Sequence, residues 1–198
     1  MMGTWKEALA RVEAGGTITL AELDEIIAKS GSRTVEESER LFQACPEWVA
    51  EDAARKKVWA ANAAKLHAEE ELLVADLRRV GAPVKDSVYD LVNTADSYPN
   101  AIPVLLNHLK RPYSDRIKEG IARALSVREA RGVAGSAVIE ALRDSQGYDR
   151  FCRWALANAL TIVATRAERD AIKALIDAES DPDVKDRLKR ALKTAAKP

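Results

Sequence analysis

The second half of the sequence repeats itself, and this repeat constrains the fold more than any other feature. Leu109, Leu142 and Leu175 are separated by 33 residues each. The same spacing separates Leu106, Ile139 and Ile172. A period of this length is typical of stacked helical hairpins, because one hairpin cannot bury its own apolar stripe and needs a neighbour to cover it.

Each repeat is predicted to contain two helices. The first helices are expected at residues 102–110, 137–144 and 170–179. Apolar positions of the second helices align at spacings of 35 and 32 residues: Ile117, Ile121, Ala124 and Leu125; Cys152, Leu156, Ala159 and Leu160; Val184, Leu188, Ala191 and Leu192. Residues 84–96 are a candidate for the second helix of a degenerate extra repeat. The sequence therefore predicts an all-α fold with a short α-solenoid over residues 84–198.

Two segments carry a resemblance to a known family. They are A-I-P-V-L-L at residues 101–106 and D-P-D-V-K at residues 181–185. Together with the apolar second helices, they resemble HEAT repeats over about residues 99–196, in particular the short bacterial kind named after phycobilisome lyases. The resemblance implies a right-handed α-solenoid whose second helices line a concave face that binds another macromolecule. The family hosts scaffolds, inhibitors, bilin lyases and DNA-repair enzymes, so it selects no single function.

Residues 1–83 do not follow the repeat and are predicted to form a helical bundle or arm, which either stands alone or packs with the solenoid as one domain. Three Thr-x-x-Glu capping boxes begin at Thr4, Thr19 and Thr34. In such a box the Thr side chain accepts from the third helical amide while the Glu reaches back to the cap. They place short helices at about residues 5–14, 20–29 and 35–44.

Residues 47–80 contain neither Gly nor Pro and are rich in strong helix formers. They predict one long helix of roughly 50 Å, at about 1.5 Å per residue. A break near Asn62 or His67 is the alternative. The core of the N-terminal region is expected to include Trp5, Trp48 and Trp59.

Charge and composition exclude several classes of protein. Lys plus Arg and Asp plus Glu both number 31, so the net charge implies no general attraction to nucleic acid or membrane. The charge is uneven, however, with 12 basic and 18 acidic residues up to residue 100, and 19 and 13 after it. Only Cys45 and Cys152 could form a disulfide, and neither a signal peptide nor a membrane-length apolar run is present. We therefore expect a cytoplasmic protein with no membrane partner.

Motifs for catalysis, metals and cofactors are missing from the sequence. His67 shares a predicted helix face with Glu70 and Glu71, which is more typical of a solvated acidic face than of a metal site. His108 is expected to cap a helix end, and Cys152 to be a small core residue. Phosphate-binding loops and nucleophile elbows do not occur. The prediction is a protein that is not an enzyme and has no cofactor.

The repeat register predicts a binding surface on the second helices. It consists of three rows, with Arg150 beside them: Lys118, Arg153 and Lys185; Glu119, Trp154 and Asp186; Arg123, Asn158 and Arg190. Arginines and a tryptophan with interleaved carboxylates are typical of a binding hot spot. The alternative is that Trp154 packs between repeats while the basic side chains extend into water.

These patterns favour a non-catalytic module that binds another protein on a concave face, for example as an inhibitor, immunity or anti-defence protein. The alternative is nucleic-acid binding by the basic C-terminal half, with Trp154 on a base; Glu119, Asp149 and Asp186 argue against it because they would repel phosphates. A third reading is an enzyme of bilin-lyase or glycosylase type, against which stands the lack of any convergent acid–base set of residues. Self-association is a fourth possibility, either between the oppositely charged halves or through the long helix.

Overall fold

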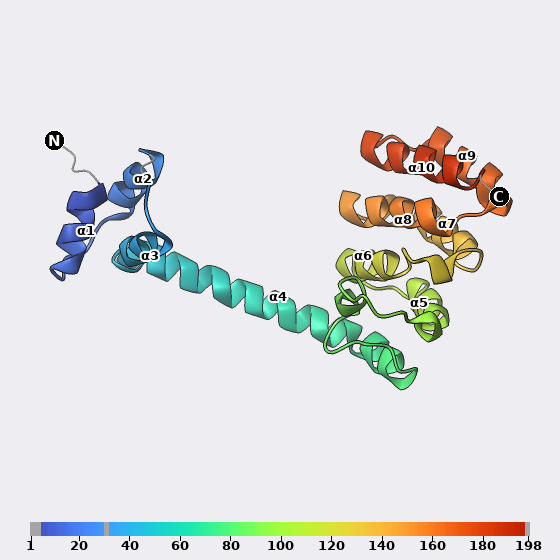
Figure 1. The fold of residues 1–198 in the computed structure, drawn as a ribbon, viewed down its shortest axis with the longest axis horizontal. Coiled ribbons are helices and arrows are strands. Elements are labelled where there is room, and N and C mark those ends of the chain that lie inside the picture. Colours follow the sequence, from blue (N-terminus) through green and yellow to red (C-terminus); the bar gives the residue numbers. More distant parts are fainter. Residues whose placement is uncertain (1–4, 30–31, 197–198) are drawn as a thin grey trace. The chain divides into compact units, whose positions relative to one another are not determined.

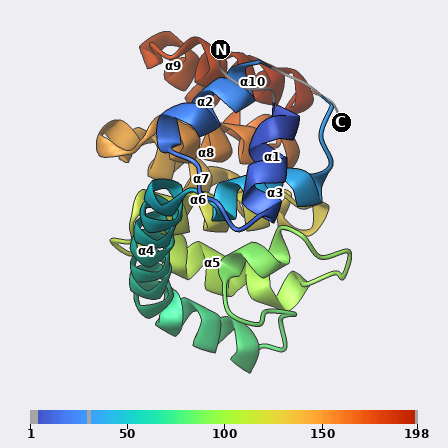
Figure 2. The same ribbon diagram turned by 90° about the vertical axis from the view of Figure 1, so that its left-hand side faces the viewer.

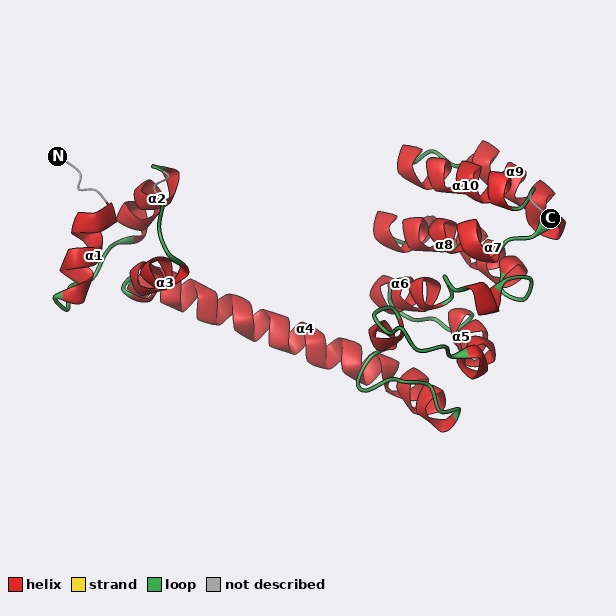
Figure 3. Cartoon of the chain, in the orientation of Figure 1, coloured by secondary structure: helices red, strands yellow, loops and turns green. Residues whose placement is uncertain are grey.

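The computed structural model describes residues 5–29 and 32–196. Every regular element in these ranges is a helix, and no β-strand occurs in them (Figure 3). The chain divides into two compact units, residues 1–64 and 65–198. The division falls inside the long helix rather than at the predicted position after residue 83, because the last turns of this helix contribute to the core of the second unit.

The first unit contains three short helices and the beginning of a long one. They are α1 (Trp5–Glu13), α2 (Leu20–Ala28) and α3 (Val35–Gln43). The capping boxes at Thr19 and Thr34 are present, and each Thr side chain accepts from the amide of the Glu three residues later. The predicted box at Thr4 lies outside the described residues. The expected helices of this unit are thus confirmed.

A small apolar cluster forms the core of the first unit. Its buried members are Leu9, Ile18, Leu23, Ile26, Leu41 and Cys45. Trp5 and Trp48 pack against this cluster, as predicted. The prediction was wrong for Trp59, which is 70% exposed. It lies on a stretch of helix, residues 53–65, in which every position is exposed.

The long helix α4 spans Pro46–Arg79 without interruption. This confirms the prediction of one continuous helix. The alternative, a break near Asn62 or His67, does not occur. Gly81 follows its end with a φ of 75°, a left-handed conformation that glycine adopts without strain at helix ends.

The second unit contains six further α-helices arranged as three hairpins. They are α5 (Ile102–Leu109), α6 (Asp115–Ala124), α7 (Gly135–Arg143), α8 (Arg150–Val163), α9 (Arg169–Ala178) and α10 (Pro182–Thr194). Short 3₁₀ helices connect them: η1 (Val88–Leu91), η2 (Pro99–Ala101), η3 (Arg128–Ala130), η4 (Ser145–Gly147) and η5 (Arg166–Glu168). Helices α6, α8 and α10 form one layer and α5, α7 and α9 the other, and the hairpins occupy successive levels in two views (Figure 1 and Figure 2). This stack is compatible with an α-solenoid.

The repeat register agrees with the packing of the second helices. The equivalent positions Ile117, Cys152 and Val184 are at most 1% exposed. In the first helices, Leu109 is buried, whereas Leu175 is half-buried because it belongs to the last hairpin of the stack. The periodicity in the sequence therefore reports a real alternation of buried positions.

Residues 84–96 do not form the extra helix that the sequence predicts. Only the single turn η1 forms, and it packs directly against α6. Gly120 permits this close approach, since a Cβ there would lie 2.6 Å from Val88 Cγ1. The buried carboxylate of Glu70 on α4 accepts from the Val88 amide at 3.0 Å. The end of α4 and η1 thus cover the first hairpin in place of another repeat.

Candidate functional site

The surface of the second helices carries a connected series of charged and aromatic side chains. Glu119 accepts from Arg116 Nη1 at 3.0 Å and from Arg123 Nε at 2.7 Å. The Trp154 ring follows, with its centroid 5.7 Å from the guanidinium carbon of Arg123 and 4.6 Å from that of Arg187. We call Arg116, Glu119, Arg123, Trp154 and Arg187 the arginine–tryptophan ladder. It joins α6, α8 and α10.

Tyr89 on η1 extends the ladder at one end. The Arg116 guanidinium carbon lies 4.1 Å from the Tyr89 ring centroid, and the Tyr89 hydroxyl donates to the Arg116 carbonyl at 3.1 Å. Burial raises the pKa of Tyr89, so this hydroxyl keeps its proton and remains a donor. Arg116 is thereby fixed in position while its side chain stays 55% exposed.

Local structure explains why Trp154 lies at the edge of the core. Asp149 caps α8 by accepting from the Cys152 amide at 2.8 Å, which fixes the first turn. Cys152 and Leu156 on this helix are fully buried, and Trp154, between them in sequence, is half-buried. Part of the indole packs against the core while the rest contributes to the surface.

Arg187 differs from the other arginines of the ladder. Its guanidinium lies over the Trp154 ring, and no carboxylate among the described residues forms an ion pair with it. A ring contact of this kind restricts the guanidinium, whose N–H edge matches a carboxylate or phosphate in a two-pronged arrangement. Arg187 is therefore the side chain of the ladder best prepared to meet an anion.

The predicted row of Lys118, Arg153 and Lys185 is not a free binding surface. Lys118 is buried, donates to the Leu109 carbonyl, and has a lowered pKa because of its burial. Lys185 donates to the Glu179 carbonyl at 3.3 Å. Arg153 Nη2 lies 2.5 Å from Glu179 Oε2. These cations hold neighbouring segments of the stack together, which corrects the placement of Lys118 on the binding face.

The remaining predicted residues are spread along the same helices. Arg150 forms an ion pair with Asp181 at 3.5 Å. Asp186 and Arg190 pair with each other on α10 at 2.9 Å, and both are exposed. Asn158 is half-buried on α8. Of the predicted set, the structure joins Glu119, Arg123 and Trp154 in one connected group, and Glu119 is buried in it.

Sequence reasoning missed two side chains beside Trp154. Arg187 aligns with Gly120 and Ala155, so the repeat register contained no row of charged side chains at this position. Phe151 precedes Trp154 by three residues on α8 and is 66% exposed. The i, i+3 spacing of these two aromatic residues was the available signal for Phe151.

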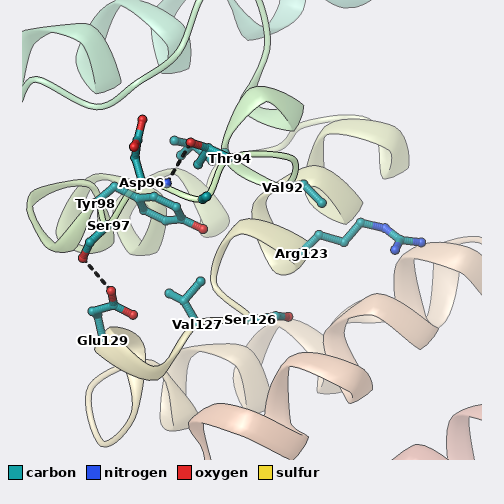
Figure 4. Close-up of a pocket in the computed structure, with 11 residues that line it drawn as sticks. Val92, Thr94, Asp96, Ser97, Tyr98, Arg123, Ser126, Val127 and Glu129 are labelled. Carbon is teal, nitrogen blue, oxygen red and sulfur yellow. Dashed lines mark hydrogen bonds between the residues drawn. The ribbon is translucent and has the colours of Figure 1, made fainter.

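A small cavity of about 250 Å³ adjoins the ladder (Figure 4). Arg123 lies at its edge, and its polar lining is paired internally, with Ser97 donating to Glu129 at 2.6 Å. This hydrogen bond is the main reason that the pKa of Glu129 is lowered, so the carboxyl is ionised at neutral pH. A general acid needs the opposite shift. Glu129 is therefore not a proton donor at neutral pH.

A second polar cluster contains the buried histidine. His108 lies 3.0 Å from Asp76 Oδ2 and 2.7 Å from the Tyr113 hydroxyl through its two ring nitrogens. The hydrogen bond from His108, with Arg79, lowers the pKa of Asp76. An acid, a histidine and a tyrosine are aligned here, but His108 is fully buried. The cluster instead attaches the end of α4 to α5.

Neither thiol chemistry nor metal chemistry is favoured by the described residues. Burial raises the pKa of Cys152 to about 12, which keeps it a protonated core residue as predicted. No cluster of three or more His, Cys, Asp or Glu side chains in these residues has the arrangement of a metal site. Within the same ranges, no helix combines the length and apolar character needed to span a bilayer.

Comparison of the chain with protein-family models, curated sequences and solved structures finds no match. The likeness to HEAT repeats therefore rests on the residues of the chain.

Proposed function

We propose that this chain is a non-catalytic protein that binds another protein through the exposed side of α6, α8 and α10. One observation carries the proposal: Trp154 is half-buried at this surface, with guanidinium groups from both neighbouring helices on its ring. Tryptophan and arginine dominate binding hot spots because they give large contact areas and directional donors. Fixing them in advance reduces the entropy that binding would otherwise cost.

Protein binding is better supported than the nucleic-acid alternative. Non-specific phosphate binding needs cations that are free to replace counterions. Lys118 is buried, and Arg150 and Arg153 are paired with carboxylates. Exposed Asp186 would repel a phosphate backbone. Three of the cations predicted to contact phosphates are therefore buried or already paired.

The proposal includes the fold family and the mode of action. We regard the hairpin stack as HEAT-like because its second helices share one apolar register and one binding side. A protein of this kind acts sterically, by covering or positioning its partner. An inhibitory role, such as that of an immunity or anti-defence protein, is the specific form of this hypothesis.

The test is capture of a partner from nuclease-treated lysate of the native host with the purified full chain. We expect one protein to bind the wild type in a fixed ratio and to be lost with Trp154→Ala, because the variant removes the ring that orients both arginines. Leu72→Ala is the matched control, since Leu72 is 51% exposed on α4 and lies outside the ladder.

Circular dichroism of each variant shows whether the fold is kept. A partner retained by folded Trp154→Ala would contradict the proposed surface. Binding only to nucleic acid, weakening steeply with salt, would contradict the proposed class of partner and favour the alternative.

A further inference from the structure

We infer that the partner presents a short segment in which a carboxylate side chain lies next to an apolar one, the carboxylate binding Arg187 and the apolar side chain covering Phe151. This inference rests on the proposed function and specifies the chemistry of the partner. It joins the unpaired guanidinium of the ladder, which lies over Trp154, to the exposed aromatic side chain three residues before Trp154 on α8.

Arg187 supplies the charge that the segment must neutralise. Arg116 and Arg123 share the carboxylate of Glu119, and Arg190 pairs with Asp186. Arg187 alone in this group has only the Trp154 ring as a described partner, 4.6 Å from the ring centroid. A carboxylate in contact with the N–H edge of a guanidinium forms a strong, charge-assisted pair.

Phe151 supplies the apolar part of the site. It is 66% exposed and lies three residues before Trp154, so both aromatic side chains lie on neighbouring parts of the α8 surface. A partner side chain covering Phe151 removes apolar surface from water, which favours binding.

The charge distribution favours an acidic peptide over a nucleic-acid strand. A single strand is held by bases that stack on open aromatic rings. The Trp154 ring already carries guanidiniums from α6 and α10. At the start of α8, Arg150 pairs with Asp181. The positive charge of Arg150 is therefore already neutralised and would attract a phosphate backbone only weakly.

Selection from a displayed library of random peptides of about 12 residues, with the immobilised full chain as bait, tests the inference. We expect the selected peptides to be rich in Asp or Glu next to an aromatic or aliphatic residue. A synthetic peptide of this type should bind Arg187→Gln at least about tenfold more weakly than wild type, since one charge-assisted contact is lost. Lys189→Gln removes the same charge from an exposed position of α10 and should bind like wild type.

Arg187→Lys separates charge from geometry. Lysine keeps the charge but lacks the planar shape of the guanidinium. The affinity of the acidic peptide for Arg187→Lys should therefore fall between its affinities for wild type and Arg187→Gln. Phe151→Ala should weaken the same peptide, while Phe151→Leu should restore most of the affinity because it remains apolar.

Three results would overturn the inference: selection of basic or uncharged peptides, selection of nothing above an empty support, or equal binding of the acidic peptide to wild type and Arg187→Gln. Binding of oligothymidine that depends on Arg187 would assign the site to a nucleic acid instead. If any of these occurs while Trp154→Ala still loses a protein captured from lysate, the proposed function stands and only the chemistry assigned to the partner is wrong.

Discussion

The two units use charged side chains in different ways. In the first unit the ion pairs lie on the surface: Arg11 contacts Glu22 at 2.8 Å and Arg40 contacts Glu13 at 3.0 Å, with all four side chains more than 40% exposed. The second unit also has surface ion pairs, but some of its charged side chains are buried. They are Glu70, Lys118, Glu119, Glu168 and Glu179.

This contrast shows which polar contacts matter for stability. Exposed ion pairs contribute little, because water and salt screen them and the side chains lose entropy. A buried charge is different, since removing its partner leaves it without compensation in a medium of low dielectric. The first unit must therefore depend on its small apolar cluster and its helix caps, whereas the second combines a continuous core with buried polar contacts between its segments.

The largest expected effects come from truncating one leucine in each core. Leu23 is 2% exposed in the first unit and Leu156 is fully buried in the second. Replacing either with alanine should cost about 2–5 kcal/mol, because burial is lost and a cavity remains. We expect two transitions in calorimetry. Leu23→Ala should lower the midpoint temperature of one transition, and Leu156→Ala that of the other. A single transition that both variants shift together would show that the units unfold as one.

Gly120→Ala should have the next largest effect and should act on the second unit alone. A Cβ at this position would lie 2.8 Å from a Tyr89 ring carbon as well as close to Val88, so these side chains of η1 must shift. Overpacking of this kind costs about 1–3 kcal/mol. Urea unfolding followed by circular dichroism measures the loss. Gly147→Ala is the control because nothing lies within 4 Å of its Cβ, and equal losses for the two variants would contradict the close-packing argument.

Periodicity explains how much of this architecture was predictable. The register of the second helices and the length of α4 follow from spacings within one helix, and the structure agrees with both. The prediction of a degenerate repeat at residues 84–96 was wrong. Apolar spacing does not reveal that Gly120 lets a single helical turn approach α6.

The candidate site was only partly predictable, for a related reason. The repeat register placed Lys118 in a row on the binding surface, yet the Lys118 side chain is buried and donates to the Leu109 carbonyl inside the stack. Arg187 was missed because the aligned residues of the other two repeats are Gly120 and Ala155, which carry no charge. Trp154 was identified correctly as a residue beside arginines, but its contacts come from two other helices and no local pattern contains them.

The pH dependence of the second unit should reflect the contact between α4 and α5. The pKa of Asp76 is lowered, first by the hydrogen bond from His108. Its stabilising effect is therefore complete above the ordinary carboxyl pKa of about 4 and is lost as the pH falls through the lower pKa of the folded state. Asp76→Asn should lower the urea midpoint at neutral pH, and the difference from wild type should shrink below about pH 4. A difference that is constant with pH would show that the charge of Asp76 contributes nothing.

The smallest expected effects come from removing the same Thr-x-x-Glu capping box in each unit. Thr34 and Glu37 form an exposed capping box on α3, whereas Thr165 donates to Glu168, a carboxylate that is only 8% exposed, at 2.7 Å. Thr34→Ala should cost about 1 kcal/mol, the ordinary value of a lost cap. Thr165→Ala should cost more, because it also removes a donor from a buried anion. Thr17→Ala, an exposed threonine that begins no helix, is the control for the side chain itself. If calorimetry gave equal costs for Thr34→Ala and Thr165→Ala, each in its own transition, burial of the charged partner would add nothing, and the distinction drawn between the two units would fail.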